Sequence, residues 1–131
     1  MSRRVLVVED SSAVRAFVRA TLEDDSATVT EAASGFEALR VLPREVFDVV
    51  VIDINMPDIN GLEVASFMRK SEAHRSTPIV LMSTEASERD RTRGLAVGAD
   101  AFLAKPFTPE ALRETITNVC SRKGHREPTD A

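Results

Sequence analysis

The sequence predicts a doubly wound α/β domain, a three-layer sandwich in which helices cover both faces of a central five-stranded parallel sheet. Short aliphatic runs, each about the length of one strand, alternate with longer segments of helical period. The runs show little polar alternation, which is typical of strands buried on both faces of a parallel sheet. A strand-helix order repeated five times needs right-handed crossovers, and these place helices on both faces.

Five segments have the length and the β-branched composition of strands. They are residues 4–8, 28–32, 49–52, 79–82 and 101–104. The third is the most apolar of them, and it stops abruptly at Asp53. Because a carboxylate is costly to bury without a partner, this ending needs an explanation.

Cap residues and apolar spacing predict the first three helices. The first follows Ser12 as its N-cap, the second follows Ser34 and stops at Pro43, and the third spans about residues 61–70. The residues expected to face the sheet are Val14, Phe17, Val18, Thr21 and Leu22 in the first helix, Ala38, Leu39 and Leu42 in the second, and Leu62, Ala65 and Met68 in the third.

The last two helices differ in the apolar surface that they carry. Residues 85–98 hold many charges and few large apolar side chains, so little burial stabilises this fourth helix. We expect it to be the most mobile helix. The fifth helix begins at Pro109, after the cap Thr108. Its sheet-facing residues are Leu112, Ile116, Val119 and Cys120.

Length and composition describe one ordinary domain, for which we expect a folded unit at residues 1–122 and a polar tail at 123–131. The single cysteine, Cys120, fits a reducing compartment. No segment has the pattern of a signal peptide or a membrane span, so we expect a cytoplasmic protein without membrane insertion. The net charge of −4, spread over both signs, argues against nucleic acid as a direct partner.

Charged and hydroxyl side chains follow four of the five predicted strands. They are Glu9 and Asp10 after the first strand, Asp53 after the third, Ser83 and Thr84 after the fourth, and Lys105 after the fifth. The carboxyl ends of the strands form the binding edge of a doubly wound sheet, so we expect these side chains to meet. Because clustered carboxylates repel one another, a cation has to lie among them, and their oxygen ligands suit Mg²⁺.

This combination of groups suits phosphoryl chemistry. A carboxylate beside Mg²⁺ can attack phosphorus to give an aspartyl phosphate, while a lysine neutralises charge on the transferring group. Asp53 is the candidate nucleophile, since it ends the most buried strand and lies centrally among the other groups. Each residue alone has an ordinary structural explanation, such as a helix N-terminal acid or a turn hydroxyl, and only their joint placement favours a site.

Four motifs occur in order along the chain. They are "ED" at residues 9–10, "DINMPDING" at 53–61, "ST" at 83–84 and "FLAKPF" at 102–107. Together they resemble the receiver domain of two-component response regulators, most of all the stand-alone CheY-like type, over about residues 4–120. The resemblance implies a flavodoxin-like fold with the strand order 2-1-3-4-5, already known for CheY. It also implies a signalling domain that is not an enzyme, because it catalyses only its own phosphorylation and dephosphorylation.

The resemblance implies a role for each matching residue. Asp53 resembles the phosphoryl acceptor. The implied Mg²⁺ ligands are Asp10, Asp53 and the backbone carbonyl of Asn55, with Glu9 acting through a coordinated water. Lys105 would pair with Asp53 and later with the phosphoryl group.

Two further positions concern switching. The Ser83 hydroxyl would move toward a phosphoryl oxygen once the acceptor is modified. Phe102 falls at the aromatic switch position, where many relatives have tyrosine, so ring packing would be the readout. The surface formed by the fourth helix, the fifth strand and the fifth helix would then signal to a downstream target protein or to a second copy in a phosphorylation-dependent homodimer.

The implied phosphoryl donor is a phosphohistidine on a sensor histidine kinase or a histidine phosphotransfer protein. The chain's own histidines, His74 and His125, lie in a predicted loop and in the tail, where we expect surface positions. No segment after residue 120 resembles a DNA-binding or enzymatic domain, so we expect output through another protein or through association.

Three alternatives stay open. A phosphorelay shuttle would pass the phosphoryl group to another histidine, and a pseudo-receiver would act only as an interaction module, although Asp10, Asp53 and Lys105 argue against the latter. A phosphohydrolase of the haloacid dehalogenase type also uses an aspartyl nucleophile and Mg²⁺. That family needs an Asp and a Thr two and four residues after the nucleophile, where this chain has Asn55 and Pro57.

Overall fold

The computed structural model describes residues 3–84 and 88–124, and in this part of the chain five parallel strands form one sheet. The strands are β1 (Arg4–Val8), β2 (Thr28–Ala32), β3 (Val49–Asp53), β4 (Ile79–Ser83) and β5 (Ala101–Ala104). Their order across the sheet is β2-β1-β3-β4-β5. The predicted fold class is therefore confirmed, and β1 and β3 are neighbouring inner strands of the sheet.

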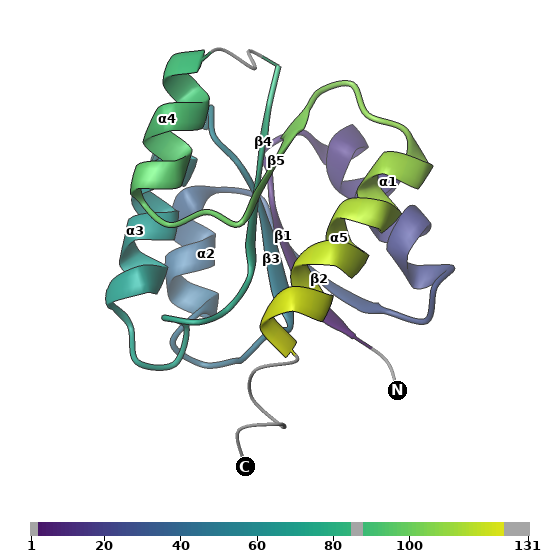
Figure 1. Ribbon diagram of the computed structural model, residues 1–131, viewed down its shortest axis with the longest axis horizontal. Helices are drawn as coiled ribbons and strands as arrows, with labels where there is room; N and C mark the ends of the chain where they lie inside the picture. The colour runs from purple at the N-terminus through teal and green to yellow at the C-terminus, as the bar shows by residue number, and fades with distance from the viewer. Residues whose placement is uncertain (1–2, 85–87, 125–131) are drawn as a thin grey trace.

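Helices cover both faces of the sheet (Figure 1). One layer holds α1 (Ser12–Glu23) and α5 (Pro109–Gly124), and the other holds α2 (Gly35–Val41), α3 (Gly61–Lys70) and α4 (Glu88–Ala96). A separate apolar cluster fills each side, because alternate side chains of the strands point to opposite faces. All five residues of β3 are buried, which explains its uninterrupted apolar run.

Three element boundaries differ by one residue from the prediction. Asp53 and Ser83 are the last residues of β3 and β4 and still lie in register with residues of the neighbouring strands. The N-cap of α1 is Ser11 instead of Ser12, since the Ser11 hydroxyl accepts a hydrogen bond from the backbone N–H of Val14 at 3.2 Å. Both side chains therefore belong to residues that are still paired within the sheet.

The predicted sheet-facing residues of the helices are mostly buried. Phe17 is the exception: it is 36% exposed, and its ring packs edge-on against Phe107 with the centroids 5.7 Å apart. Of residues 88–96 in α4, Gly94 alone is buried, as the sparse apolar content predicted. Residues 85–87, which were predicted to begin this helix, lie outside the described residues, and its mobility stays a prediction.

His74 is not at the surface, so that prediction was wrong. Its side chain is 1% exposed, and its Nε2 atom lies 2.5 Å from the backbone oxygen of Leu42, the C-cap residue of α2. Carbonyl groups at the end of a helix have no partner within the helix, and the imidazole ring bonds to one of them. His125 lies outside the described residues.

The remaining predictions about the extent of the domain concern the chain ends. The last helix, α5, ends at Gly124. The division into a domain at 1–122 and a tail at 123–131 stays a prediction. Within residues 3–84 and 88–124, no helix has the length and apolar character that crossing a bilayer requires.

The first residue of α3 has no room for a side chain. A Cβ atom on Gly61 would lie 2.2 Å from the backbone oxygen of Asp53, whereas a Cβ atom on Gly94 would lie 2.8 Å from the flexible end of Leu81. We expect Gly61→Ala to lower the free energy of unfolding by about 2–3 kcal/mol, because the backbone beside the site has to shift. Gly94→Ala should cost less, since alanine favours a helix by about 1 kcal/mol.

Urea denaturation of the two alanine variants measures this difference. Equal losses of stability would contradict the tight contact between α3 and the end of β3.

Candidate functional site

The carboxyl ends of β1 and β3 bring three carboxylates together. Val8 and Ile52 are in register in these neighbouring parallel strands, so the residues that follow them, Glu9 and Asp53, lie side by side. Asp10 is next in the chain. One carboxylate oxygen from each of the three acids lies within 4.8 Å of the others. The predicted acidic cluster at this edge of the sheet therefore exists.

Lys105, which follows β5, reaches two of these acids. Its Nζ atom lies 2.6 Å from Oε1 of Glu9 and 3.2 Å from Oδ1 of Asp53. The prediction paired Lys105 with Asp53, and the structure adds the shorter contact with Glu9. The ammonium group is mostly buried, with 14% of the side chain exposed, so solvent screens these ion pairs only weakly.

Glu9 is held in place by the start of α1. Its Oε2 atom accepts a hydrogen bond from the backbone N–H of Ser11 at 3.0 Å, and its backbone oxygen accepts one from Nη1 of Arg15 at 2.8 Å. Arg15 also forms an ion pair with Glu31 at 2.9 Å. The sequence prediction did not include Arg15, because no motif marks it and its contact depends on how α1 packs over β1.

The electrostatics of the site favour a cation. Burial raises the pKa of Glu9 and of Asp53 above the ordinary carboxyl value, and Lys105 offsets only part of this effect. Burial alone would lower the pKa of Lys105, but its hydrogen bond to Glu9 and the charge of Asp53 raise it. Glu9 and Asp53, at 1% and 3% exposure, thus share one ammonium group, and Asp10 adds a third carboxylate beside them.

The donor set fits a hard divalent cation. Carboxylate oxygens are the ligands that Mg²⁺ prefers, and a divalent charge would balance the acids that Lys105 does not neutralise. Asp10 is exposed, in contrast with Glu9 and Asp53, so the cluster is open to solvent on the side of Asp10. This arrangement suits an ion that keeps several water ligands, as Mg²⁺ does.

Ser83 and Asn55 meet next to this cluster. Ser83 is fully buried at the end of β4, and Nδ2 of Asn55 donates a hydrogen bond to its hydroxyl oxygen at 3.4 Å. The backbone N–H of Ile54 bonds to the oxygen of Met82 at 2.9 Å, which continues the pairing of β3 with β4 beyond Asp53. The loop after β3 is thereby tied to the strand that carries the hydroxyl.

Phe102 lies in β5, three residues before Lys105, and it faces α4. The guanidinium carbon of Arg91, in α4, lies 5.0 Å from the centroid of the Phe102 ring, a cation–π contact. The sequence prediction did not identify Arg91, because the contact depends on where α4 docks.

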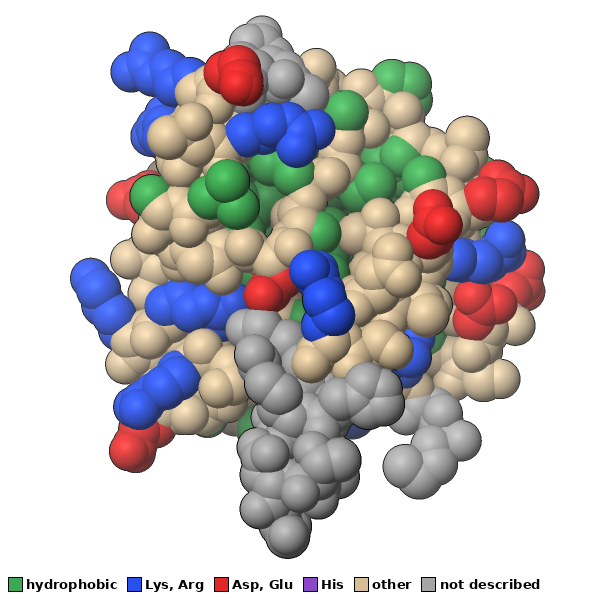
Figure 2. All heavy atoms as spheres, viewed as in Figure 1, with side chains coloured by type: hydrophobic (Ala, Val, Ile, Leu, Met, Phe, Trp, Pro, Cys, Tyr) green, Lys and Arg blue, Asp and Glu red, His purple; other side chains and the backbone are tan. Residues whose placement is uncertain are grey.

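A pocket of about 220 Å³ lies between α4 and β5. It is lined by Arg91, Gly94, Leu95, Ala99, Asp100, Ala101 and Phe102. Figure 2 shows hydrophobic side chains in the upper half of this face of the molecule, with basic side chains beside them. Leu95, one of the residues that line this pocket, is 72% exposed.

Fold and site together define a receiver domain. The family model for the response regulator receiver domain matches residues 5–117. The chain therefore belongs to the response regulator receiver family, as its motifs predicted. Receiver domains are signalling domains of two-component systems, and this membership leaves the haloacid dehalogenase alternative without support.

Solved structures with this fold include two informative relatives. The chemotaxis response regulator CheY4 of Vibrio cholerae is 39% identical, with a TM-score of 0.87, and the match covers 91% of this chain and 99% of CheY4. The receiver domain of the sensor histidine kinase PA1611 from Pseudomonas aeruginosa PAO1 is 27% identical, with a TM-score of 0.85, covering 92% and 99%. The PA1611 structure has a magnesium ion coordinated in its active site cleft.

The curated relatives are longer than this chain. Transcriptional regulatory protein SrrA of Staphylococcus aureus is 31% identical over 119 residues, which make up 91% of this chain and 47% of SrrA. The chain thus spans about half the length of the curated relatives that it matches.

Because burial raises the pKa of Glu9 and of Asp53, we expect these acids to lower the stability of the metal-free protein near neutral pH. Between the ordinary carboxyl pKa and the raised pKa values of Glu9 and Asp53, the folded chain binds more protons than the unfolded chain, so stability falls as the pH rises through this window. We expect Asp53→Asn to raise the Tm of the metal-free protein near neutral pH by about 3–6 °C, the shift that 1 kcal/mol produces in a domain of this size.

Thermal melts in EDTA and in Mg²⁺ check this expectation. The matched control is Asp24→Asn, which changes an exposed carboxylate at the C-cap of α1. Mg²⁺ should stabilise the parent and the control more than it stabilises Asp53→Asn. If Asp53→Asn has a lower Tm than the parent in EDTA, the buried carboxylates do not destabilise the metal-free protein.

Proposed function

We propose that this chain is a single-domain response regulator that accepts a phosphoryl group on Asp53 from a partner phosphohistidine, in a Mg²⁺-dependent reaction. Membership of the receiver family supports this proposal. The observation that carries it is the buried Asp53 carboxylate at the end of β3, grouped with Glu9 and Asp10 and 3.2 Å from the Lys105 ammonium.

Asp53 is the proposed nucleophile. A carboxylate oxygen forms a bond to phosphorus while the bond between phosphorus and the donor histidine nitrogen breaks, and the electron pair of that bond returns to the imidazole. The rigid strand end holds the carboxylate in one position, which favours an in-line attack. The product is an acyl phosphate on Asp53.

Glu9, Asp10, Asp53 and the backbone carbonyl of Asn55 are the proposed residues that hold Mg²⁺. When bound, Mg²⁺ supplies positive charge that stabilises the oxygens of the transferring group. The acidic donor set described above supports this assignment, and the magnesium ion in the PA1611 receiver domain is a related case.

Lys105 and Ser83 are proposed to act on the modified acceptor. The Lys105 ammonium already contacts Oδ1 of Asp53, so it can remain paired as negative charge moves onto the phosphoryl oxygens. The hydroxyl of Ser83 is proposed to donate a hydrogen bond to a phosphoryl oxygen. Phe102, beneath Arg91, is the proposed aromatic reporter of this change.

The proposed output is a change in the surface formed by α4, β5 and α5, which binds a downstream target protein or a second copy of the chain. The pocket between α4 and β5 and the exposed side chain of Leu95 support this choice. The proposed donor is a sensor histidine kinase or a histidine phosphotransfer protein, and the cytoplasm is the proposed compartment.

Phosphoryl transfer to Asp53 is tested with acetyl phosphate and with a panel of phosphorylated histidine kinases. We expect Asp53→Asn to show no hydroxylamine-sensitive acyl phosphate, whereas Asp24→Asn should be labelled like the parent. EDTA should abolish labelling of the parent. Mass spectrometry of the intact protein gives the readout, and labelling of Asp53→Asn at the parent level would refute the assignment.

Lys105→Met tests the proposed role of the ammonium group. We expect the rate of labelling by acetyl phosphate to fall by about 100-fold, because a positioned charge in a site of this kind contributes that much. The control is Lys70→Met, which removes an exposed ammonium from the end of α3. A rate within about twofold of the parent would contradict the role, because it would mean almost no loss of transition-state stabilisation.

A further inference from the structure

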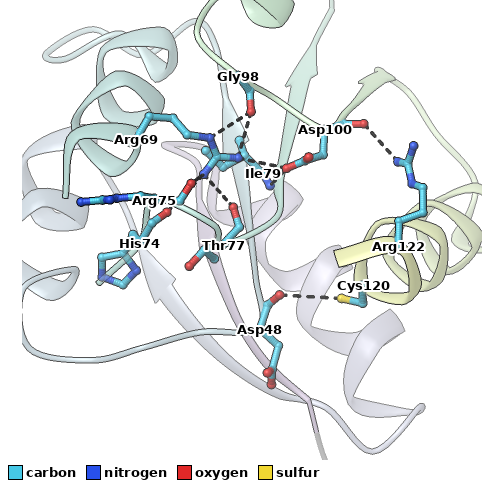
Figure 3. Close-up of polar contacts among 10 residues, drawn as sticks. All are labelled: Asp48, Arg69, His74, Arg75, Thr77, Ile79, Gly98, Asp100, Cys120 and Arg122. Carbon is cyan, nitrogen blue, oxygen red and sulfur yellow. Dashed lines mark hydrogen bonds and ion pairs between the residues drawn. The ribbon is translucent and has the colours of Figure 1, made fainter. Parts of the chain in front are cut away.

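The side chain of Arg69, in the last turn of α3, bonds to the turn that follows α4 (Figure 3). Nε and Nη2 of Arg69 both donate to the backbone oxygen of Gly98, at 3.1 and 2.8 Å, and Nη2 also contacts Oδ2 of Asp100 at 3.0 Å. Nη1 donates to the backbone oxygens of His74, Arg75 and Thr77, at 3.2, 3.2 and 2.9 Å. All three nitrogens of the guanidinium group are thus engaged.

Gly98 is the point at which α4 turns into β5. Its φ of +93° is a conformation that side-chain-bearing residues rarely adopt, and a Cβ atom there would lie 3.0 Å from Nε of Arg69. The backbone N–H groups of Gly98 and Ala99 bond back to Leu95 and Gly94, each at 3.0 Å. The turn therefore closes the helix and lies directly against the Arg69 side chain.

Asp100 extends this attachment to the sheet. Its Oδ2 atom accepts a hydrogen bond from the backbone N–H of Ile79 at 2.9 Å, and its own backbone N–H donates to the oxygen of Ile79 at 2.8 Å. Arg122 of α5 donates to the backbone oxygen of Asp100 at 3.3 Å. The loop between α4 and β5 is thereby joined to α3, to the start of β4 and to α5.

The rest of α4 contributes little buried surface to the domain. Gly94 is the one buried residue among 88–96, and it packs against Leu81 without a side chain of its own. Nearer the N-terminal end, the guanidinium group of Arg91 contacts the ring of Phe102. Residues 88–96 therefore add little buried surface, whereas the turn that follows them is tied down by the short hydrogen bonds of Arg69 and Asp100.

The proposed phosphorylation acts at the other end of α4. Asp53 and Ser83 lie at the carboxyl ends of their strands, and the chain leads from Ser83 to the first residue of α4, Glu88. The Arg69 network lies at the opposite end of the sheet, where β4 and β5 begin. A helix that is fixed at one end and displaced at the other swings about the fixed end. From Ala96 to Glu88 the helix is about 12 Å long, at about 1.5 Å per residue.

The pocket between α4 and β5 would then have one fixed wall, on the β5 side, and one movable wall, on the α4 side. Ala99, Asp100, Ala101 and Phe102 line it from the β5 side, which the Arg69 network anchors. Arg91, Gly94 and Leu95 line it from α4. A swing about Gly98 changes the width of the pocket most at Arg91 and least at the turn.

We propose that Arg69 is a positioning residue that makes the C-terminal end of α4 a fixed pivot, so that phosphorylation of Asp53 opens or closes the pocket between α4 and β5 at its Arg91–Phe102 end. This inference rests on the proposed phosphoryl acceptance by Asp53, and it specifies how that modification controls the docking surface. Without the pivot, a displacement at the N-terminal end of α4 would shift or loosen the whole helix. The pocket would then have no defined width.

Amide hydrogen exchange on the unaltered protein tests the pivot directly, with and without beryllofluoride as the phosphoryl mimic and with Mg²⁺ present. We expect exchange rates to change by about tenfold at residues 91–95 and by less than about twofold at 97–101, since local opening is confined to the unanchored part. A change at 97–101 as large as that at 91–95 would overturn the proposal.

Arg69→Lys tests the role of the side chain. Lysine keeps the positive charge near Asp100, but it lacks the planar fork that contacts Gly98 and three further carbonyl groups at once. We expect residues 97–101 to exchange about tenfold faster than in the parent, and the response to beryllofluoride to spread over them. The same substitution at exposed Arg40, in α2, is the matched control and should behave like the parent.

Labelling of Asp53 by acetyl phosphate separates the two proposals. Arg69 is remote from the acidic cluster, so Arg69→Lys should be labelled at a rate within about twofold of the parent. If the parent itself is not labelled, the proposed function fails. If the parent is labelled but Arg69→Lys shows the parental exchange pattern, the pivot alone fails.

Discussion

The shortage of positive charge at the carboxyl ends of β1 and β3 is the constraint on which the rest of this structure depends. Two nearly buried acids, Glu9 and Asp53, share the ammonium group of Lys105, and a third acid completes the cluster. Burial raises the pKa of both buried acids, so the folded chain holds them at a cost in the absence of a cation. Such a site favours a divalent metal, and in the proposed reaction the same cations would neutralise the charge of the transferring phosphoryl group.

The two ends of the sheet differ in how well their charged and polar groups are paired. At the carboxyl end, charged side chains are close together and incompletely balanced, and the loops there leave Asp10 and Asn55 exposed. At the opposite end, Arg69 and Asp100 join α3, α4, β4 and α5 through well-paired backbone groups. The buried ring of His74, which bonds to the backbone oxygen of Leu42 at the C-cap of α2, also lies at this second end.

Helix α4 connects these two regions, and its composition suits that position. It is rich in charge, and a glycine takes the place of a large side chain where it meets the sheet. Weak burial lowers the cost of displacing the helix, while the Gly98 turn retains its far end. The Arg91–Phe102 contact joins α4 to β5, so the proposed swing of α4 would change it. No tyrosine hydroxyl is needed for such a readout, because ring packing and charge respond to distance.

The sequence by itself determined the order of strands and helices, the most apolar strand, and the acids, hydroxyl and lysine at the strand ends. These follow from local periodicity and from the rule that parallel strands place their carboxyl ends at one edge, so the cluster of Glu9, Asp10, Asp53 and Lys105 could be predicted. Only the tertiary structure decided which acid Lys105 contacts most closely, that Arg15 supports Glu9, and that His74 is buried. It also decided the attachment of α4 through Arg69 and the approach of Arg91 to Phe102. These contacts join residues that are far apart in the sequence or separated by a loop, and their geometry depends on how each helix docks, which no local pattern of residues encodes.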